Sequence, residues 1–143
     1  MKRKKVLLDI NIILDLLLAR EPFAVVAREI FQKAINEEIE IYVTNCSINT
    51  LVYFIEKTVG HEATRQIIND FLQIAKGIDI TINDIQKAFL NTDITDTEDA
   101  IQIQGAIKAN IDFLLTRDKK FAKIKTTQVT VITPEDFLNL IRG

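Results

Sequence analysis

Four aspartates stand where predicted strands end or where a helix begins. Asp9 directly follows the apolar run at residues 5–8, and Asp118 follows a second apolar run further along the chain. Asp96 and Asp99 open a helical segment, and their spacing of three puts them on one helix face. Open α/β sheets bind ligands at the carboxyl edge of their strands. We therefore expect the carboxylates of Asp9, Asp99 and Asp118 to converge there within metal-bridging distance, with Asp96 close by.

Such a group of carboxylates predicts a hard divalent cation. Carboxylates held close together repel one another unless they share a proton or a cation. Oxygen ligands favour Mg²⁺ or Mn²⁺, and a single histidine and a single cysteine offer no zinc site. A bound cation can activate a water and neutralise charge on a phosphoryl oxygen. The pattern predicts phosphodiester hydrolysis, with Asp9, Asp99 and Asp118 catalytic and all four aspartates holding metal. The plainer alternative for Asp96 and Asp99 is that they complement a helix dipole.

Two polar residues are predicted to support these acids. Asn11 is expected to fix the loop that carries Asp9, or to contact a metal-bound water. Thr116 is expected to hold Asp118, or a phosphate, through its hydroxyl group. The one cysteine, Cys46, is interpreted as a buried small hydrophobic side chain, since no histidine lies near it in the sequence.

A basic cluster follows directly after the last of the predicted strand-end acids. The predicted substrate-binding residues are Arg117, Lys119, Lys120 and Lys123. A basic cluster is often only a solvated face, but this one flanks an acidic site on a net acidic protein. Phosphate steering is the functional alternative.

Composition limits the kind of molecule this is. The 143 residues are 48% hydrophobic, which fits one domain over residues 1–143 with an adequate core. The net charge of −2 means that a polyanion partner needs a local basic patch. One cysteine fits a reducing compartment. No apolar segment is long enough for a membrane, and the apolar stretch behind the basic leader is interrupted by Asp9, Asn11 and Asp15. We expect a cytoplasmic protein with no membrane contact.

Hydrophobic periodicity predicts strands that alternate with helices. The expected strands are residues 4–9, 39–43, 78–82, 111–116 and 129–132. The expected helical segments are residues 11–18, 23–38, 47–60, a second up to 77, one up to 90 capped by Asn83 or Asp84, one up to 110, and one from 133. Thr95 and Glu98 match a capping box for the helix up to 110. The predicted fold is α/β, a doubly wound three-layer α/β/α arrangement with a central parallel sheet of about four or five strands.

The whole chain resembles a PIN domain, the nuclease fold of VapC-type toxins and related ribonucleases. The motif residues are Asp9 with Asn11 and Asp15, then Asp96, Asp99 and Ala100, then Thr116, Arg117, Asp118 and Phe121. The resemblance implies a Mg²⁺- or Mn²⁺-dependent endoribonuclease that cuts single-stranded RNA and in which the acids hold the metal. It also implies the toxin of a toxin-antitoxin pair, with an antitoxin protein over the acidic cleft, and a homodimer.

One position departs from the family pattern. The family places an acid, usually glutamate, in the helix after the second strand, near residues 50–53. This chain has Asn49 and Thr50 there, and no carboxylate occurs between Glu40 and Glu56. Asp96 is the candidate to supply the missing ligand from the other side. The alternative function is therefore a catalytically impaired PIN-like module that binds RNA or a protein.

A third function class is an aspartate-based phosphatase of the haloacid dehalogenase type. An aspartate after a first strand can act as a nucleophile. That class places a second aspartate at position 11, where this chain has Asn11. The phosphatase interpretation is therefore disfavoured.

Overall fold

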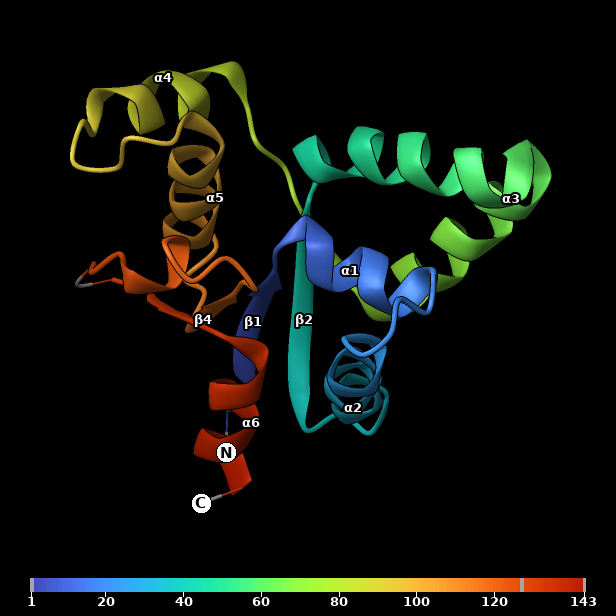
Figure 1. Cartoon of the computed structure of the whole chain (residues 1–143). Helices are drawn as coiled ribbons and strands as arrows, with labels where there is room; N and C mark the ends of the chain where they lie inside the picture. Colours follow the sequence, from blue (N-terminus) through green and yellow to red (C-terminus); the bar gives the residue numbers. More distant parts are fainter. Residues whose placement is uncertain (1, 127, 143) are drawn as a thin grey trace.

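The computed structural model describes residues 2–126 and 128–142. Its centre is a parallel sheet of five strands in the order β3-β2-β1-β4-β5 (Figure 1). The strands are β1 (Lys4–Leu8), β2 (Ile39–Thr44), β3 (Lys76–Ile78), β4 (Phe113–Leu115) and β5 (Thr130–Ile132). The predicted α/β/α fold with a parallel sheet is confirmed.

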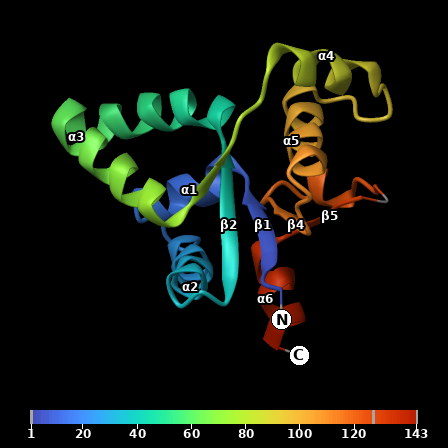
Figure 2. The ribbon, with the colours of Figure 1, turned by 180° about the vertical axis from the view of Figure 1, so that it is seen from behind.

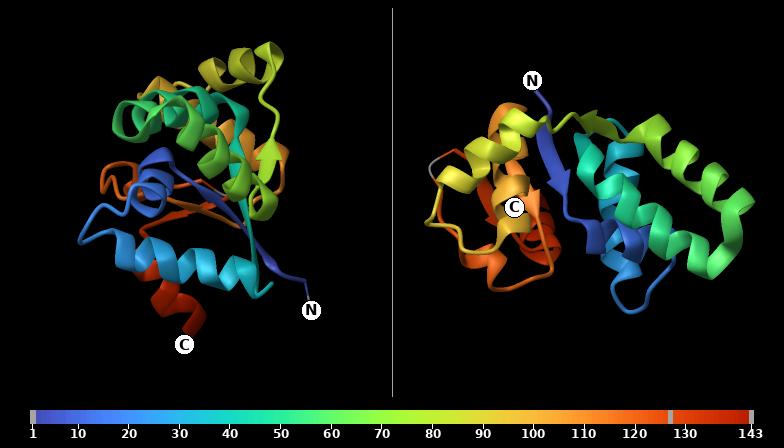
Figure 3. Two further views of the ribbon diagram at one scale, coloured as in Figure 1. Left: turned by 90° about the vertical axis from the view of Figure 1, so that its right-hand side faces the viewer. Right: turned by 90° about the horizontal axis from the view of Figure 1, so that it is seen from above.

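Helices cover both faces of the sheet because the strand side chains are apolar on both sides. In β1, Val6 and Leu8 pack into one core, and Leu7 packs into the other. The first core is shared with α1 (Ile10–Leu17), α2 (Ala24–Ile35), α3 (Asn45–Ile74) and α6 (Pro134–Arg142). The second is shared with α4 (Ile82–Leu90), α5 (Thr97–Lys108) and the short 3₁₀ turn at Phe121–Lys123. Seen from above, β1 runs between α3 on one side and α4 with α5 on the other (Figure 3).

Helix α3 is two helices joined at a glycine. Gly60 has a positive φ of 84°, which a residue without Cβ adopts at little cost. The two halves diverge sharply at this point (Figure 2). The predicted break at Gly60 is confirmed. The first half begins directly after β2, with the hydroxyl of Thr44 accepting a hydrogen bond from the Ser47 amide, so its first turn lies at the carboxyl edge of the sheet.

The third strand lies earlier in the chain than predicted. The alternating isoleucines at 78, 80 and 82 suggested a strand over residues 78–82, but β3 is Lys76–Ile78. The amide of Ile80 donates to the Asn45 side chain at 2.9 Å, and Ile82 already begins α4. The polar side chain of Asn45 therefore replaces the sheet partner that the periodicity implied.

Two helix caps also differ from prediction. Thr81 caps α4 in a reciprocal capping box with Asp84, in place of the predicted cap at Asn83 or Asp84. Asp96 caps α5 in place of Thr95, and its Oδ1 accepts from the Asp99 amide at 3.0 Å. Threonine and aspartate are both good caps, so spacing alone could not choose between adjacent registers.

Within the part of the chain that the structure describes, no helix combines the length and apolar character needed to cross a membrane.

Candidate functional site

An acidic cavity of about 420 Å³ lies at the carboxyl edge of the sheet. It is bounded by the residues that follow β1, the first turns of α3 and α5, and the segment after β4. All four aspartates predicted as metal ligands line it, together with one further acid. These acidic side chains are Asp9, Asp96, Glu98, Asp99 and Asp118.

Asp9 reaches the cavity because β1 ends one residue before it. Its amide donates to the carbonyl of Leu115 at 3.0 Å, and this contact holds the end of β1 beside β4. One carboxylate oxygen caps α1 by accepting from the Ile10 amide at 2.8 Å, and the other accepts from the Thr116 hydroxyl at 2.9 Å. Burial raises the pKa of Asp9, although both hydrogen bonds favour the charged form, and the charges of Asp118 and Glu98 raise it further.

Thr116 joins two of the acids. Its side chain is fully buried, and while its hydroxyl donates to Asp9 it also accepts from the Asp118 amide at 3.1 Å. Asp118 then accepts from the Lys120 amide at 2.9 Å. The sequence assigned Thr116 to Asp118 or to a phosphate. In the structure it holds the backbone of Asp118 and the carboxylate of Asp9.

The carboxyl group of Asp99 has a strongly raised pKa. Burial raises the pKa of Asp99 first, and the nearby charges of Asp96, Asp9, Asp118 and Glu98 raise it further, to about 7. A carboxyl group that is half protonated near neutral pH marks a surplus of negative charge in the cavity. A cation placed among these acids would relieve that repulsion.

The wall formed by α3 contains no carboxylate among its cavity-lining residues. It presents Cys46, Ser47 and Thr50, next to Thr44 at the end of β2, so a thiol and hydroxyl groups stand where the family pattern has its acid. The interpretation of Cys46 as a buried residue is wrong, because its side chain is exposed and lines the cavity. Cys46 lies in the first turn of α3 and is not part of the core that Leu51 and Ile55 join later in the same helix.

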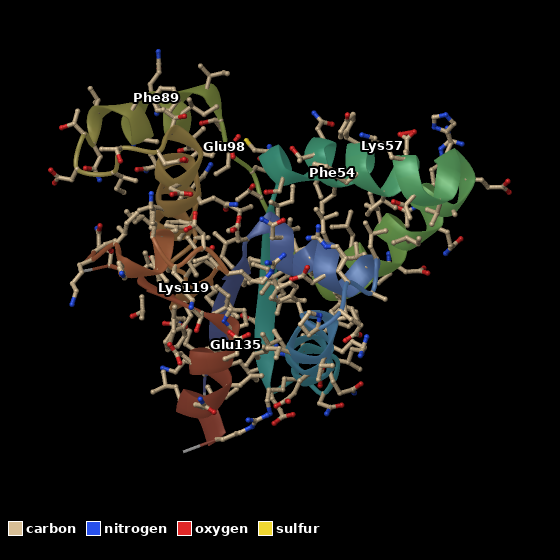
Figure 4. All side chains as sticks on the ribbon, viewed as in Figure 1. Phe54, Lys57, Phe89, Glu98, Lys119 and Glu135 are labelled. Carbon is tan, nitrogen blue, oxygen red and sulfur yellow. The ribbon has the colours of Figure 1, made fainter. Side chains whose placement is uncertain are left out.

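Two polar cavity residues on α5 were missed from the sequence. Glu98 was assigned to a capping box, but the cap lies at Asp96, and Glu98 lies between the first turns of α3 and α5 (Figure 4). Gln102 also lines the cavity, and its Oε1 is a buried side-chain atom with no hydrogen-bond partner among the described residues. Helical spacing could have found both, since Gln102 is three residues after Asp99 and four after Glu98.

The donor set suits a hydrated hard cation better than a closed metal cage. Within residues 2–126 and 128–142, no three His, Cys, Asp or Glu side chains stand close enough together to hold one ion. Asp9, Asp99 and Asp118 line one cavity, as predicted, but in the described part of the chain they do not form a three-carboxylate cluster around a single point. Helix capping by Asp9 and Asp96 holds those carboxylates at their own helix ends. Mg²⁺ commonly keeps several waters and uses one or two carboxylates plus substrate phosphate, and the all-oxygen cavity fits that mode.

The predicted supporting and substrate-binding residues fall into three groups. Asn11 lines the cavity, and its Oδ1 accepts from Arg20 at 3.2 Å. Arg117 does not line the cavity, because its guanidinium binds Asp15. The lysines of the cluster are exposed, and no ion pair involves them in the described part of the chain. These are Lys119, Lys120 and Lys123. Figure 4 places Lys119 on the segment after β4, well apart from Glu98.

Several solved structures have the same arrangement of elements. VapBC2 from Rickettsia felis, bound to a DNA fragment from its promoter, has a TM-score of 0.66 and 17% identity, covering 90% of this chain and 98% of that chain. A toxin-antitoxin complex from Klebsiella pneumoniae has a TM-score of 0.66 and 24% identity, covering 90% and 97%. Mycobacterium tuberculosis VapC20, a sarcin-ricin loop cleaving toxin, has a TM-score of 0.63 and 13% identity, covering 81% and 92%. At these identities the likeness shows a shared fold.

The family is identified by comparing the sequence with models of protein families. Comparison with curated proteins finds no significant match. The family model described as PIN domain matches residues 5–120, which includes every acid of the cavity. With the parallel sheet and the acids at its carboxyl edge, this match shows that the chain belongs to the PIN domain family.

Proposed function

We propose that this protein is a Mg²⁺- or Mn²⁺-dependent endoribonuclease that hydrolyses phosphodiester bonds in single-stranded RNA. The observation that carries the proposal is the acidic cavity, which Asp9, Asp99 and Asp118 line together and in which burial, followed by the neighbouring carboxylates, raises the pKa of Asp99 to about 7. An anionic substrate would be repelled by these acids alone. A divalent cation between them and a phosphate turns the repulsion into attraction.

The cavity residues have different proposed roles in binding the cation. One or two of Asp9, Asp99 and Asp118 would bind the cation directly and the rest through its waters, and Asp96 adds charge from the start of α5. The cation, when bound, neutralises charge on the phosphoryl oxygens and orients a water. Thr116 keeps Asp9 and Asp118 in register through its two hydrogen bonds. Asn11, at the rim of the cavity, is placed to contact a water or a phosphate oxygen.

We propose further that the protein is the toxin of a toxin-antitoxin pair and acts in the cytoplasm on RNA. The solved complexes with the same fold include toxin-antitoxin assemblies. An antitoxin that covers the acidic cavity would exclude RNA from it. The open reading frame next to this one is therefore expected to encode a small protein that binds this chain and blocks cleavage.

The direct test of the proposed activity is a cleavage assay on labelled single-stranded RNA. Wild-type protein with Mg²⁺ or Mn²⁺ should cut the RNA, excess EDTA should stop the reaction, and added Mn²⁺ should restore it. A panel of unrelated RNA sequences is needed, because the cavity alone does not define a preferred sequence. Absence of cleavage on the whole panel with either metal would refute the nuclease.

The basic cluster gives a separate prediction on RNA binding. Replacing Lys119, Lys120 and Lys123 with glutamate should weaken RNA binding at least about tenfold at moderate salt and flatten its salt dependence, because phosphate contacts release counterions. Fluorescence anisotropy at several salt concentrations measures both effects. The matched control is glutamate at Lys2 and Lys4, which are exposed at the opposite end of β1. Equal affinity and salt slope for all proteins would make the cluster a solvated face.

A second candidate function is a binding module without nuclease activity. The observation that favours it is the α3 wall, where Thr50 and its neighbours supply hydroxyl groups and no carboxylate. Replacing Thr50 with glutamate should then create the missing acid. If the natural site is already competent, Thr50→Glu should change Mn²⁺ affinity and cleavage by less than about threefold. If the natural protein is inactive and Thr50→Glu cuts RNA, the binding module is the correct function.

A further inference from the structure

A buried carboxylate outside the cavity is held by two arginines. Asp15 on α1 is only 1% exposed, yet it is absent from the cavity wall. Its Oδ1 accepts from Arg20 Nε at 3.0 Å and from Arg117 Nη2 at 3.1 Å, while its Oδ2 accepts from Arg117 Nε at 2.6 Å. A buried charge is costly unless it is paired and hydrogen-bonded, and here both carboxylate oxygens are paired.

Arg117 connects this carboxylate to the cavity. It lies between Thr116, which bonds to Asp9, and Asp118, which lines the cavity. Its guanidinium also stacks on the ring of Phe23, 3.9 Å from the ring centroid. The fork of two hydrogen bonds and the stacked ring together hold one orientation of the side chain. The backbone that carries Thr116 and Asp118 is thereby tied to α1.

Arg20 connects the same carboxylate to the other side of the cavity. Its Nη2 donates to the carbonyl oxygen and to the side-chain Oδ1 of Asn11, each at 3.2 Å. Asn11 lies in the first turn of α1, two residues after Asp9. Asp15 is therefore linked to two of the three segments that bring acids to the cavity, the one after β1 and the one after β4.

We propose that Asp15 and Arg117 form a positioning pair that fixes the separation of Asp9 and Asp118. This inference rests on the proposed function, since it gives the pair a role in metal binding and catalysis at that site. It also gives Arg117 a role different from the predicted substrate binding, because its guanidinium binds Asp15. A buried ion pair by itself is weak support for stability, since apolar residues of similar size often replace such pairs without loss.

Because apolar residues can replace a buried ion pair without loss of stability, such a replacement distinguishes a positioning role from a purely stabilising one. Asp15→Leu combined with Arg117→Leu removes both charges and leaves a packed apolar contact beside Phe23. The double variant should melt near the wild-type temperature. Its kcat should still fall about 10- to 100-fold, with KM changed less than about threefold, because orientation of the metal-binding groups is lost. Its Mn²⁺ affinity, measured by titration without RNA, should fall about tenfold.

A second variant covers the case in which the double variant does not fold. Asp15→Asn keeps the shape but removes the charge, and it should show the same losses of kcat and Mn²⁺ affinity at a lower melting temperature. The matched control is Ile30→Ala in the core of α2, which should lower the melting temperature while leaving kcat and Mn²⁺ affinity unchanged.

The outcomes are distinct. Wild-type cleavage together with full kcat and Mn²⁺ affinity in the variants would overturn the positioning pair and leave the nuclease standing. Wild-type protein that binds Mn²⁺ but cuts no RNA would refute the nuclease, and weaker Mn²⁺ binding by the variants would then still support the pair. Wild-type protein that neither cuts RNA nor binds Mn²⁺ would overturn both.

Discussion

Replacing Asp9 with asparagine should abolish RNA cleavage, with a loss on the order of 100-fold or more, while nearly preserving the shape of the site. Asparagine is also a good helix cap, so its Oδ1 can still accept from the Ile10 amide. The Thr116 hydroxyl can accept a hydrogen bond from the new amide nitrogen. What is lost is the negative charge that the cation requires. The measurement is the single-turnover cleavage rate with saturating Mn²⁺.

The stability of Asp9→Asn should change in the opposite direction. Without metal, the variant should be as stable as wild type or more stable, because burial and the charges of Asp118 and Glu98 already disfavour the Asp9 carboxylate. Added Mn²⁺ should raise the melting temperature of wild type and barely affect the variant. The control is Asp79→Asn, an exposed aspartate outside the cavity, which should keep both activity and the metal response. Full activity in Asp9→Asn would remove Asp9 from the proposed site.

The pH dependence of stability should identify Asp99. Its folded-state pKa of about 7 lies above the ordinary value of 3.8, so between these values the folded protein holds a proton that the unfolded chain has lost. The stabilisation is fully present below about pH 4 and is lost as pH rises through 7. Metal-free wild type should therefore lose stability between about pH 4 and pH 7, and Asp99→Asn should lose less. Urea unfolding at several pH values measures the difference.

Metal affinity should follow the same proton with the opposite slope. A cation competes with the proton on Asp99. As the pH rises toward 7, Mn²⁺ affinity should therefore increase by up to about tenfold per pH unit, and above pH 7 it should level off. Saturating Mn²⁺ should flatten the fall in stability between about pH 4 and pH 7. An identical pH slope in wild type and Asp99→Asn would show that another group titrates.

The acids were predictable because they follow from strand ends. A buried parallel strand delivers its next residue to the carboxyl edge of the sheet, so Asp9 and Asp118 could be placed from apolar runs alone. Asp96 and Asp99 could be placed from the start of a helix with a clear apolar pattern. These are local rules, and each depends only on a few neighbouring residues.

The contacts of Arg117 could not be predicted from local sequence patterns. In the sequence it belongs to a run of basic residues, which predicted a shared role in binding phosphate. Thr116 donates a hydrogen bond to Asp9, and Asp118 lines the cavity, whereas Arg117 binds Asp15 on α1. Its partner is 102 residues away, and no spacing pattern contains that contact.

Glu98 shows a second limit. Residues 95 and 96 can both cap a helix, and in the structure the cap of α5 is Asp96. That choice decides whether Glu98 serves the cap or faces the cavity. The α3 wall is a third case, because its hydroxyl groups have no distinctive sequence spacing and became cavity residues only through the fold.

Direct measurement of Mn²⁺ binding tests the acidic cavity most sharply. Electron paramagnetic resonance detects free Mn²⁺ as protein is titrated, and it requires neither an RNA sequence nor turnover. Wild type should take up Mn²⁺ at pH 8, Asp79→Asn should match it, and Asp9→Asn and Asp99→Asn should bind at least about tenfold more weakly. Equal binding by all four proteins, or none by wild type at millimolar Mn²⁺, would contradict a metal site in this cavity.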